Sequence, residues 1–413
     1  MCEGRTWTCL HSLWRNFLNF STANPAFLTP SCLGNWTGNL RKTGSLGIIS
    51  ILPGLGQSQL ICYEGYPSEE YEILTEDGYY LRINRIPYGR EKPTDKGPKP
   101  AVLLQHGLFG QGSNWIENLA NNSLGFMLAD AGYDVWIGNS RGTTWSQRHQ
   151  KFSVAQEEFW DFSFHEMGKY DLQAMINFIL QKTGQKQLYY VGYSQGGTIA
   201  FIAFSTMPQL AQKVKMFFAL APAAIVGHTK SPMVKMLLMP EGALQDFLGK
   251  KDFRWWGKTM RDLAAKICCC ELPAKLCANV FFFAGGFNEK NLNMVCVYIY
   301  ISPISFLVMI KIKLTLSVQQ HLYFDYGSEN KAKYNQSVPP VYKIEDMTVP
   351  TAVWSGGEDW MVDPKDIDML LPRITNLVYH KNVSDWNHWD FTWGLDAAKR
   401  VYSEIIALMG KYP

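Results

Sequence analysis

The sequence predicts an α/β fold in which a mostly parallel, doubly wound sheet is interrupted by a helical insertion. Apolar, strand-like runs alternate with helix-compatible segments between residues 101 and 222, as expected for strands joined by helical crossovers. This alternation lapses over residues 223–346 and resumes at residue 347. A β-rich run also ends in a glycine-bounded serine turn that leads directly into an apolar helix, which is a strand-turn-helix arrangement.

The first predicted elements of the sheet are a hairpin and a buried strand. Residues 71–75 and 79–86 flank an Asp-Gly turn, which favours two antiparallel strands. Residues 101–105 form a continuous apolar run, typical of a strand buried on both faces of a parallel sheet. Further strands are predicted at residues 133–138, 188–191, 215–222, 350–354 and 377–381, and helices at residues 169–180, 199–204 and 395–409.

Four segments are predicted along the chain. Residues 1–57 form a leader of no clear structure, residues 58–222 and 347–413 form the two parts of the core, and residues 223–346 form a mostly helical cap. The leader has no convincing signal peptide because Trp14 and Arg15 interrupt any apolar stretch. No transmembrane span is predicted, because the apolar run within the cap is too short and contains a proline.

Composition limits the classes of partner. The chain of 413 residues is 47% hydrophobic and 18% charged, which provides enough apolar material for a large core. A formal net charge of +3 is too small to indicate nucleic acid as a partner. The nine cysteines show no metal-ligand spacing, so neither a metal nor a cofactor is predicted. Glycosylation sequons occur at Asn19, Asn35, Asn121, Asn335 and Asn382.

Ser194 is the candidate nucleophile. It lies in the turn Gly192-Tyr-Ser-Gln-Gly between a predicted strand and a predicted helix. Glycines at positions 192 and 196 allow the strand and helix to approach closely, which leaves the serine exposed at the tip of the turn. The amides at the start of the helix favour a developing oxyanion.

A serine nucleophile needs a histidine base and a carboxylate that orients it. His388 and Asp359 each follow a predicted strand, and the order Ser194, Asp359, His388 is the chain order typical of such sheets. Asp363 precedes a proline and is predicted to cap a helix instead. The other weighed histidines lie before the serine turn, within the insertion or inside a strand: His106, His149, His228, His321 and His380.

Two main-chain amides are candidate oxyanion donors. Leu108 follows the buried strand at residues 101–105 in a glycine-bounded loop, and Gln195 directly follows the nucleophile. Loops at the carboxyl ends of parallel strands meet at one edge of a sheet. We therefore expect the amides of Leu108 and Gln195 to face the Ser194 hydroxyl.

In several of its motifs the chain resembles the animal acid lipase family. The similar stretches include Gln105-His-Gly-Leu, Gly138-Asn-Ser-Arg-Gly and Gly286-Phe-Asn-Glu-Lys-Asn-Leu-Asn-Met. The resemblance covers residues 58–290 and 334–413. It implies an α/β-hydrolase fold, a helical cap over the active site, hydrolysis of triglycerides or cholesteryl esters, and a glycosylated protein of the lysosome or of secretions. It also implies a Ser194, Asp359 and His388 triad with oxyanion amides at Leu108 and Gln195.

The chain departs from the family pattern at several positions. Tyr193 and Gly197 stand where the family usually has histidine and threonine. Gly285 stands where the resemblance implies a cysteine paired with Cys277, so that disulfide is expected to be absent. Residues 295–320 differ from the family's cap sequence, and the leader lacks the family's secretory signal.

Two hypotheses of different classes follow. In the first, the protein is a serine-dependent hydrolase of lipid esters that acts through an acyl-enzyme. In the second, it is a lipid-binding relative that binds esters without turnover because its cap is altered. A thioesterase or peptidase on the same fold is a further alternative, since the fold alone does not fix the substrate.

Overall fold

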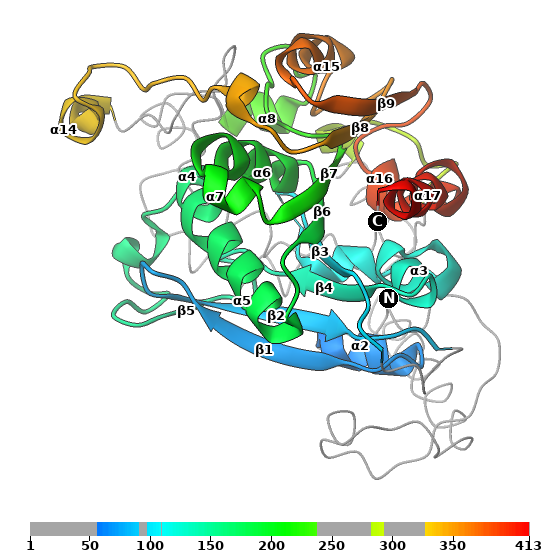
Figure 1. Ribbon diagram of the computed structural model, residues 1–413. Helices are drawn as coiled ribbons and strands as arrows, with labels where there is room; N and C mark the ends of the chain where they lie inside the picture. The colour runs from blue at the N-terminus through cyan, green and yellow to red at the C-terminus, as the bar shows by residue number, and fades with distance from the viewer. Residues whose placement is uncertain (1–55, 91–96, 109, 238–281, 293–326, 413) are drawn as a thin grey trace, which may run out of the picture.

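The computed structural model describes residues 56–90, 97–108, 110–237, 282–292 and 327–412 (Figure 1). The leader up to residue 55 and most of the predicted cap lie outside these ranges. The proposed domain boundaries at residues 57, 222 and 346 therefore stay predictions. A helix that the sequence did not predict begins at Gln57, the last residue of the expected leader.

Nine strands form one sheet within the described residues. They are β1 (Glu69–Leu74), β2 (Tyr79–Ile86), β3 (Ala101–Gln105), β4 (Asp134–Gly138), β5 (Arg148–His149), β6 (Leu188–Tyr193), β7 (Val214–Leu220), β8 (Thr351–Gly356) and β9 (Leu377–Val383). Their order is β1-β2-β4-β3-β6-β7-β8-β9, with β5 paired to β2. The pairs from β4 through β9 are parallel, whereas β2 runs antiparallel to β1, β4 and β5. The predicted mostly parallel sheet is therefore confirmed.

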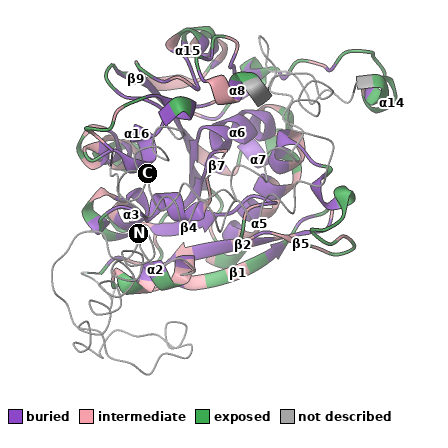
Figure 2. Cartoon of the chain, turned by 180° about the vertical axis from the view of Figure 1, so that it is seen from behind, coloured by how far each residue is buried: buried purple, intermediate pink, exposed green. Residues whose placement is uncertain are grey.

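Helices cover both faces of this sheet (Figure 1). The α-helices of the described residues are α2 (Gln57–Tyr63), α3 (Leu124–Asp130), α4 (Phe164–Glu166), α5 (Gln173–Thr183), α6 (Gln195–Thr206), α7 (Pro208–Ala211), α8 (Pro232–Leu237), α14 (Asn330–Tyr334), α15 (Pro364–Leu370), α16 (Asp390–Trp393) and α17 (Ser403–Lys411), of which α14 lies away from the sheet (Figure 1). Side chains of α5 and α6 belong to the apolar core on one face, and side chains of α3 and α17 belong to the core on the other. Figure 2 shows the central strands as almost wholly buried.

The helix predicted at residues 169–180 is longer than expected. It begins with α4 and continues through a π-helical stretch at Met167–Leu172 into α5. Ser163 Oγ accepts a hydrogen bond from His165 N, and Glu166 Oε2 accepts one from Ser163 N. This capping box fixes the earlier start. The helix ends at Gly184, whose φ of 69° is the left-handed conformation expected of a C-cap glycine.

The closing helix begins later than residue 395. Leu395 N instead donates to Asn291 O at 2.6 Å, so this residue pairs with the segment at residues 286–292. The helical stretch then runs from Ala398 through a π-helical turn into α17.

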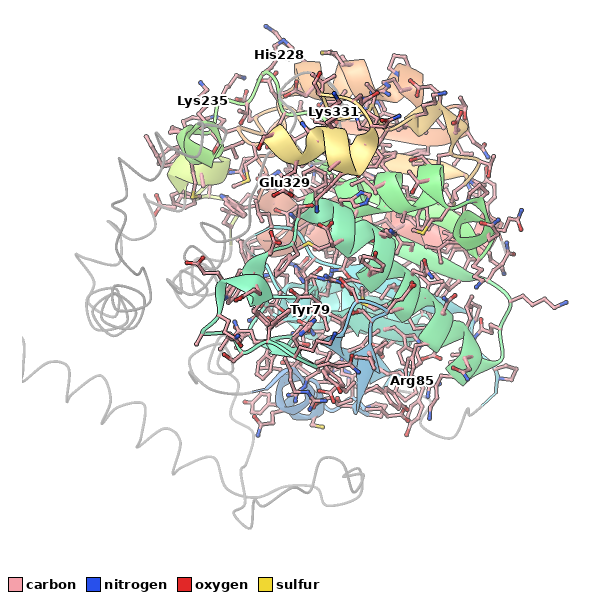
Figure 3. All side chains as sticks on the ribbon, turned by 90° about the vertical axis from the view of Figure 1, so that its left-hand side faces the viewer. Tyr79, Arg85, His228, Lys235, Glu329 and Lys331 are labelled. Atoms are coloured by element: carbon pink, nitrogen blue, oxygen red, sulfur yellow. The ribbon has the colours of Figure 1, made fainter. Side chains whose placement is uncertain are left out.

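Across the molecule, Arg85 of β2 lies at the opposite end of the sheet from His228 (Figure 3).

A buried ion network joins the loop after β4 to the helical layer. The Arg141 side chain is 0% exposed. Its Nε donates to Asp171 Oδ1 at 2.7 Å, and its Nη1 donates to Asp77 Oδ2 at 2.5 Å. Its guanidinium also lies 4.1 Å from the centre of the Tyr79 ring. Both carboxylates compensate the buried cation, so the network fixes the loop that follows β4.

Candidate active site

Ser194 lies in a strained turn between β6 and α6. Its φ of 53° and ψ of −115° are unusual for a residue with a side chain. A Cβ on Gly192 would lie 2.6 Å from Gly196 O, and a Cβ on Gly196 would lie 2.5 Å from Gln105 O. The two glycines therefore permit the close approach of β6 and α6 that the sequence predicted, and Gly196 also permits the approach of α6 to the end of β3, which was not predicted. As a result the Ser194 hydroxyl is held at the carboxyl edge of the parallel strands.

The structure brings the three predicted side chains together. Nε2 of His388 lies 2.9 Å from Ser194 Oγ, and Nδ1 of His388 lies 2.8 Å from Asp359 Oδ2. Ser194, His388 and Asp359 are 4%, 1% and 0% exposed, respectively. The expectation that Ser194 is exposed at the tip of its turn is therefore wrong, because the loops at the carboxyl edge of the sheet, including the His388 loop, pack around it. This is the chain of contacts that a serine nucleophile, its base and an orienting carboxylate require.

Asp359 is fixed by its own loop. Oδ1 accepts hydrogen bonds from Met361 N and Val362 N, each at 2.8 Å, while Oδ2 faces the imidazole. An ionised carboxylate only accepts hydrogen bonds, so Nδ1 of His388 must donate. With the ring proton on Nδ1, Nε2 accepts the hydrogen bond of the Ser194 hydroxyl.

Both predicted oxyanion residues lie beside the serine. Gln195 is the first residue of α6, so its N–H has no acceptor within the helix. Leu108 follows Gly107, and a Cβ on Gly107 would lie 2.7 Å from Ser194 Cβ. Within the described residues, neither amide has a hydrogen-bond acceptor. Both remain available to a ligand oxygen next to Ser194.

His106 holds the loop that carries Leu108. Its Nδ1 lies 2.8 Å from Gly107 O, and its Nε2 accepts a hydrogen bond from Ser140 N at 3.1 Å. Complete burial lowers the pKa of His106 to about 4, so the ring is neutral and accepts at Nε2. Chain order excluded this histidine as the base, but no sequence signal indicated its role as a loop anchor.

Asp390 is a second buried carboxylate near His388, the predicted base. It accepts hydrogen bonds from Asn288 Nδ2 at 3.0 Å, from Asn291 Nδ2 at 2.6 Å and from Asn387 N at 2.7 Å. Burial raises its pKa to about 6, despite these donors. Asp390 thus fastens the His388 loop to residues 286–292 rather than contacting the triad.

The rival candidates form other contacts. Asp363 caps α15 by accepting from Lys365 N at 3.0 Å, as predicted. His228 pairs with Asp366 at 2.8 Å, and Nε2 of His380 lies 3.1 Å from Ser355 Oγ. His149 contacts Asp77 O at 3.0 Å. His321 lies outside the described residues.

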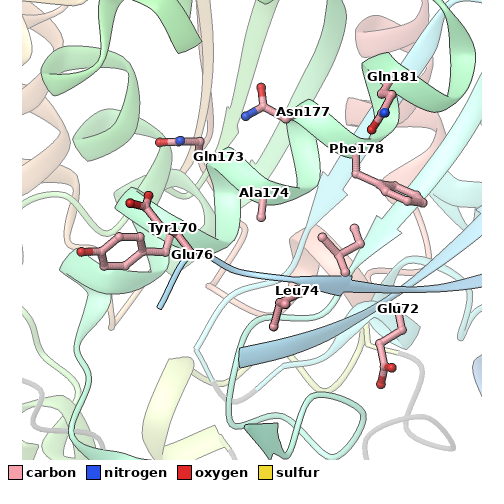
Figure 4. Close-up of a pocket in the computed structure, with 10 residues that line it drawn as sticks. Glu72, Leu74, Glu76, Tyr170, Gln173, Ala174, Asn177, Phe178 and Gln181 are labelled. Atoms are coloured by element: carbon pink, nitrogen blue, oxygen red, sulfur yellow. The ribbon is translucent and has the colours of Figure 1, made fainter. Parts of the chain in front are cut away.

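Other features of the described part of the chain lie away from this site. No group of three or more His, Cys, Asp or Glu side chains there could hold a metal ion. One pocket lies between β1 and α5, lined by Glu72, Leu74, Gln173 and Phe178 among others (Figure 4), and none of its lining residues belongs to the Ser194 site. No helix in the described ranges is both long and apolar enough to cross a membrane.

Gly285 differs from the cysteine that the resemblance implies. A Cβ at this position would lie 2.2 Å from Trp389 Nε1. The indole of Trp389 thus occupies the space that a side chain at residue 285 would need. Cys277 lies outside the described residues, but Gly285 has no thiol with which to pair.

Comparisons with known proteins agree with this fold. Residues 100–395 match the family described as alpha/beta hydrolase fold, and residues 57–119 match the partial alpha/beta-hydrolase lipase region. A lysosomal acid lipase/cholesteryl ester hydrolase of Homo sapiens is 52% identical over 390 residues, covering 92% of this chain and 97% of that protein. Lipase member M of Homo sapiens is 52% identical over 358 residues, covering 85% of each chain. Gastric triacylglycerol lipase of Homo sapiens is 48% identical over 360 residues, covering 86% of this chain and 90% of that protein.

The chain therefore belongs to the alpha/beta hydrolase fold family. Within that family it is a carboxylic ester hydrolase of the acid lipase group, because these lipases match it over most of its length. The resemblance inferred from the sequence motifs is confirmed.

Proposed function

We propose that the protein hydrolyses the esters of water-insoluble lipids, triglycerides or cholesteryl esters, through Ser194, His388 and Asp359. The observation that carries the proposal is the pair of contacts from His388, 2.9 Å to Ser194 Oγ and 2.8 Å to Asp359 Oδ2. The substrate class is supported by the names of the relatives, which include a cholesteryl ester hydrolase and a triacylglycerol lipase.

Acylation begins with attack of Ser194 Oγ on the ester carbonyl carbon. Nε2 of His388 takes the serine proton, and Asp359 stabilises the imidazolium that forms. The amides of Leu108 and Gln195 donate hydrogen bonds to the carbonyl oxygen as it becomes negatively charged. The bond between the carbonyl carbon and the alcohol oxygen then breaks, and His388 returns the proton to the leaving alcohol.

Deacylation repeats these steps with water. His388 takes a proton from a water molecule as the water oxygen attacks the acyl carbon. The same two amides hold the second oxyanion. The bond to Ser194 Oγ breaks, the serine regains a proton from His388, and the fatty acid leaves. Both half-reactions thus use the same base and the same two amides.

The cap and the compartment belong to the same proposal. We assign residues 223–346 to a cap that covers the acyl chain of the substrate, since apolar walls suit a fatty chain better than a peptide. We assign the protein to the lysosome or to secretions. This assignment is supported by the relatives and by the exposed sequon residues Asn121, Asn335 and Asn382.

The test is labelling with a fluorophosphonate, which reacts with activated serines. The wild-type protein should be labelled at Ser194 and should hydrolyse triolein and cholesteryl oleate emulsions. Ser194→Ala should lose labelling and reduce hydrolysis by about 10⁴-fold or more. Ser205→Ala is the matched control, because Ser205 lies on the same helix, where its hydroxyl donates to Phe201 O.

Three results would contradict the proposal. Wild-type protein that is labelled elsewhere, or not at all, has no activated Ser194. Tight binding of cholesteryl oleate without turnover would instead support the catalytically silent lipid-binding protein. Preference for acyl thioesters over oxygen esters would support the thioesterase.

A further inference from the structure

The main chain of His388 is held at both of its polar atoms. His388 N donates to Gly285 O at 3.2 Å. His388 O accepts a hydrogen bond from the Tyr193 hydroxyl at 2.9 Å. Within the described ranges, no second donor reaches this carbonyl oxygen. The residue that supplies the base is therefore fixed by main-chain contacts as well as by its ring nitrogens.

Tyr193 connects the two reacting residues directly. It is the last residue of β6 and precedes Ser194, and its residue is 3% exposed. Its ring centre lies 5.1 Å from the centre of the His388 ring. Burial and the nearby Asp359 carboxylate raise the pKa of Tyr193 well above its usual value. The phenol consequently stays protonated and remains a hydrogen-bond donor.

We propose that Tyr193 is a positioning residue whose hydroxyl sets the distance between the base and the nucleophile by holding the main chain of His388. The inference rests on the proposed function, because it assigns Tyr193 a part in the Ser194 reaction. Tyr193 needs no contact with the substrate for this role. It acts through the position of the imidazole.

The location of His388 explains why such a link matters. His388 lies in the loop between β9 and α16, whereas Ser194 is fixed between β6 and α6. Proton transfer needs Nε2 and Oγ within about 2.6–3.2 Å of each other. A misplacement of about 1 Å can cost about 100-fold in rate. The hydrogen bond from Tyr193, which precedes Ser194, to the main chain of His388 therefore holds the imidazole at a fixed distance from the Ser194 hydroxyl.

The experiment compares Tyr193→Phe with Tyr402→Phe. Both changes remove one buried hydroxyl that donates to a main-chain carbonyl. Tyr402 is 1% exposed, and its hydroxyl donates to Phe391 O at 2.7 Å. The two acceptors lie close together in the chain, so a purely structural effect should appear equally in both variants.

The two variants should differ in catalysis. In Tyr193→Phe, we expect kcat for p-nitrophenyl butyrate and the rate of fluorophosphonate labelling to fall about tenfold, since a buried acceptor loses its donor beside the base. The Ki of a non-hydrolysable ether analogue of a triglyceride should stay unchanged. Tyr402→Phe should keep kcat and the labelling rate within about twofold of the wild type, because its acceptor is not on His388.

A second pair of substitutions separates hydrogen bonding from packing. At position 193, 4-fluorophenylalanine fills the space of the hydroxyl without donating, so it should reproduce the loss even if Tyr193→Phe fails to fold. In contrast, 4-aminophenylalanine keeps a donor in place and should restore most of the rate.

The inference is overturned if both phenylalanine variants lose kcat equally, or if the 4-fluorophenylalanine protein is as active as the wild type. It is also overturned if the 4-aminophenylalanine protein is as slow as the 4-fluorophenylalanine protein. These outcomes leave the proposed function intact, provided that the wild-type protein is labelled at Ser194. Absence of wild-type labelling refutes the proposed function itself.

Discussion

Asp390→Asn should change how the stability of the protein depends on pH. Asp390 is 0% exposed, and its carboxylate accepts hydrogen bonds from Asn288 and Asn291. In the part of the chain that the structure describes, no Lys or Arg forms an ion pair with it. Asp396, itself paired with Arg400, adds a nearby negative charge. Burial and this charge disfavour the ionised form of Asp390.

The magnitude follows from the raised pKa. The pKa of Asp390 rises from 3.8 to about 6. At about 1.36 kcal/mol per pH unit, a shift of about two units corresponds to about 3 kcal/mol. Because the folded-state pKa is raised, this contribution to the free energy of unfolding is fully present below about pH 4 and is lost as the pH rises through about 6.

The assay is urea unfolding at pH 4.0 and pH 7.5, followed by tryptophan fluorescence. The substituted amide cannot ionise, so the free energy of unfolding of Asp390→Asn should gain about 3 kcal/mol relative to wild type between these pH values. Glu289→Gln is the matched control, because Glu289 is an exposed carboxylate between the two asparagines. The reasoning is refuted if the difference between Asp390→Asn and wild type changes by less than about 1 kcal/mol across this range.

Two further substitutions test the site and the core. Gly107→Ala places a Cβ 2.7 Å from Ser194 Cβ, so fluorophosphonate labelling should slow at least about tenfold and the free energy of unfolding should fall by about 1–3 kcal/mol. The control Gly410→Ala, whose new Cβ has no atom within 4 Å, should leave the labelling rate unchanged. Equal labelling rates in the two variants would contradict the proposed contact. Arg141→Met leaves the buried Asp171 carboxylate without its cation, so urea unfolding should show a loss of about 3–5 kcal/mol. Arg148→Met removes an ion pair whose arginine side chain is 58% exposed and should cost about 1 kcal/mol or less. Equal losses in these two arginine variants would show that burial of Arg141 does not set the cost.

The sheet could be predicted because its signals are local. Residues 101–105 and 188–191 are continuous apolar runs, and both lie in central parallel strands. The Asp77-Gly78 turn predicted the β1–β2 hairpin, and Gly78 adopts a φ of 99°. In contrast, the helix starts earlier than its apolar periodicity indicates, because its first turn is fixed by the side-chain capping box of Ser163 and Glu166.

The Ser194 site was predicted from chain order and turn chemistry. Those two features place residues at the carboxyl edge of the sheet, and the structure brings Ser194, Asp359 and His388 together there. The supporting contacts are different in kind. Pairings such as Asp390 with Asn288, or His106 with Ser140, join residues far apart in the chain. No local sequence pattern indicates which distant residues will pair, so these contacts can be identified only in the folded structure.

The backbone conformation of Ser194 limits how this protein can be made more heat-resistant. A residue with a side chain in such a region costs about 1–3 kcal/mol compared with a relaxed conformation. Glycine would relieve part of that cost but would remove the hydroxyl. Resistance to heat and the reactivity proposed for Ser194 therefore compete at this position, and engineering for thermal tolerance has to find its gains elsewhere in the chain.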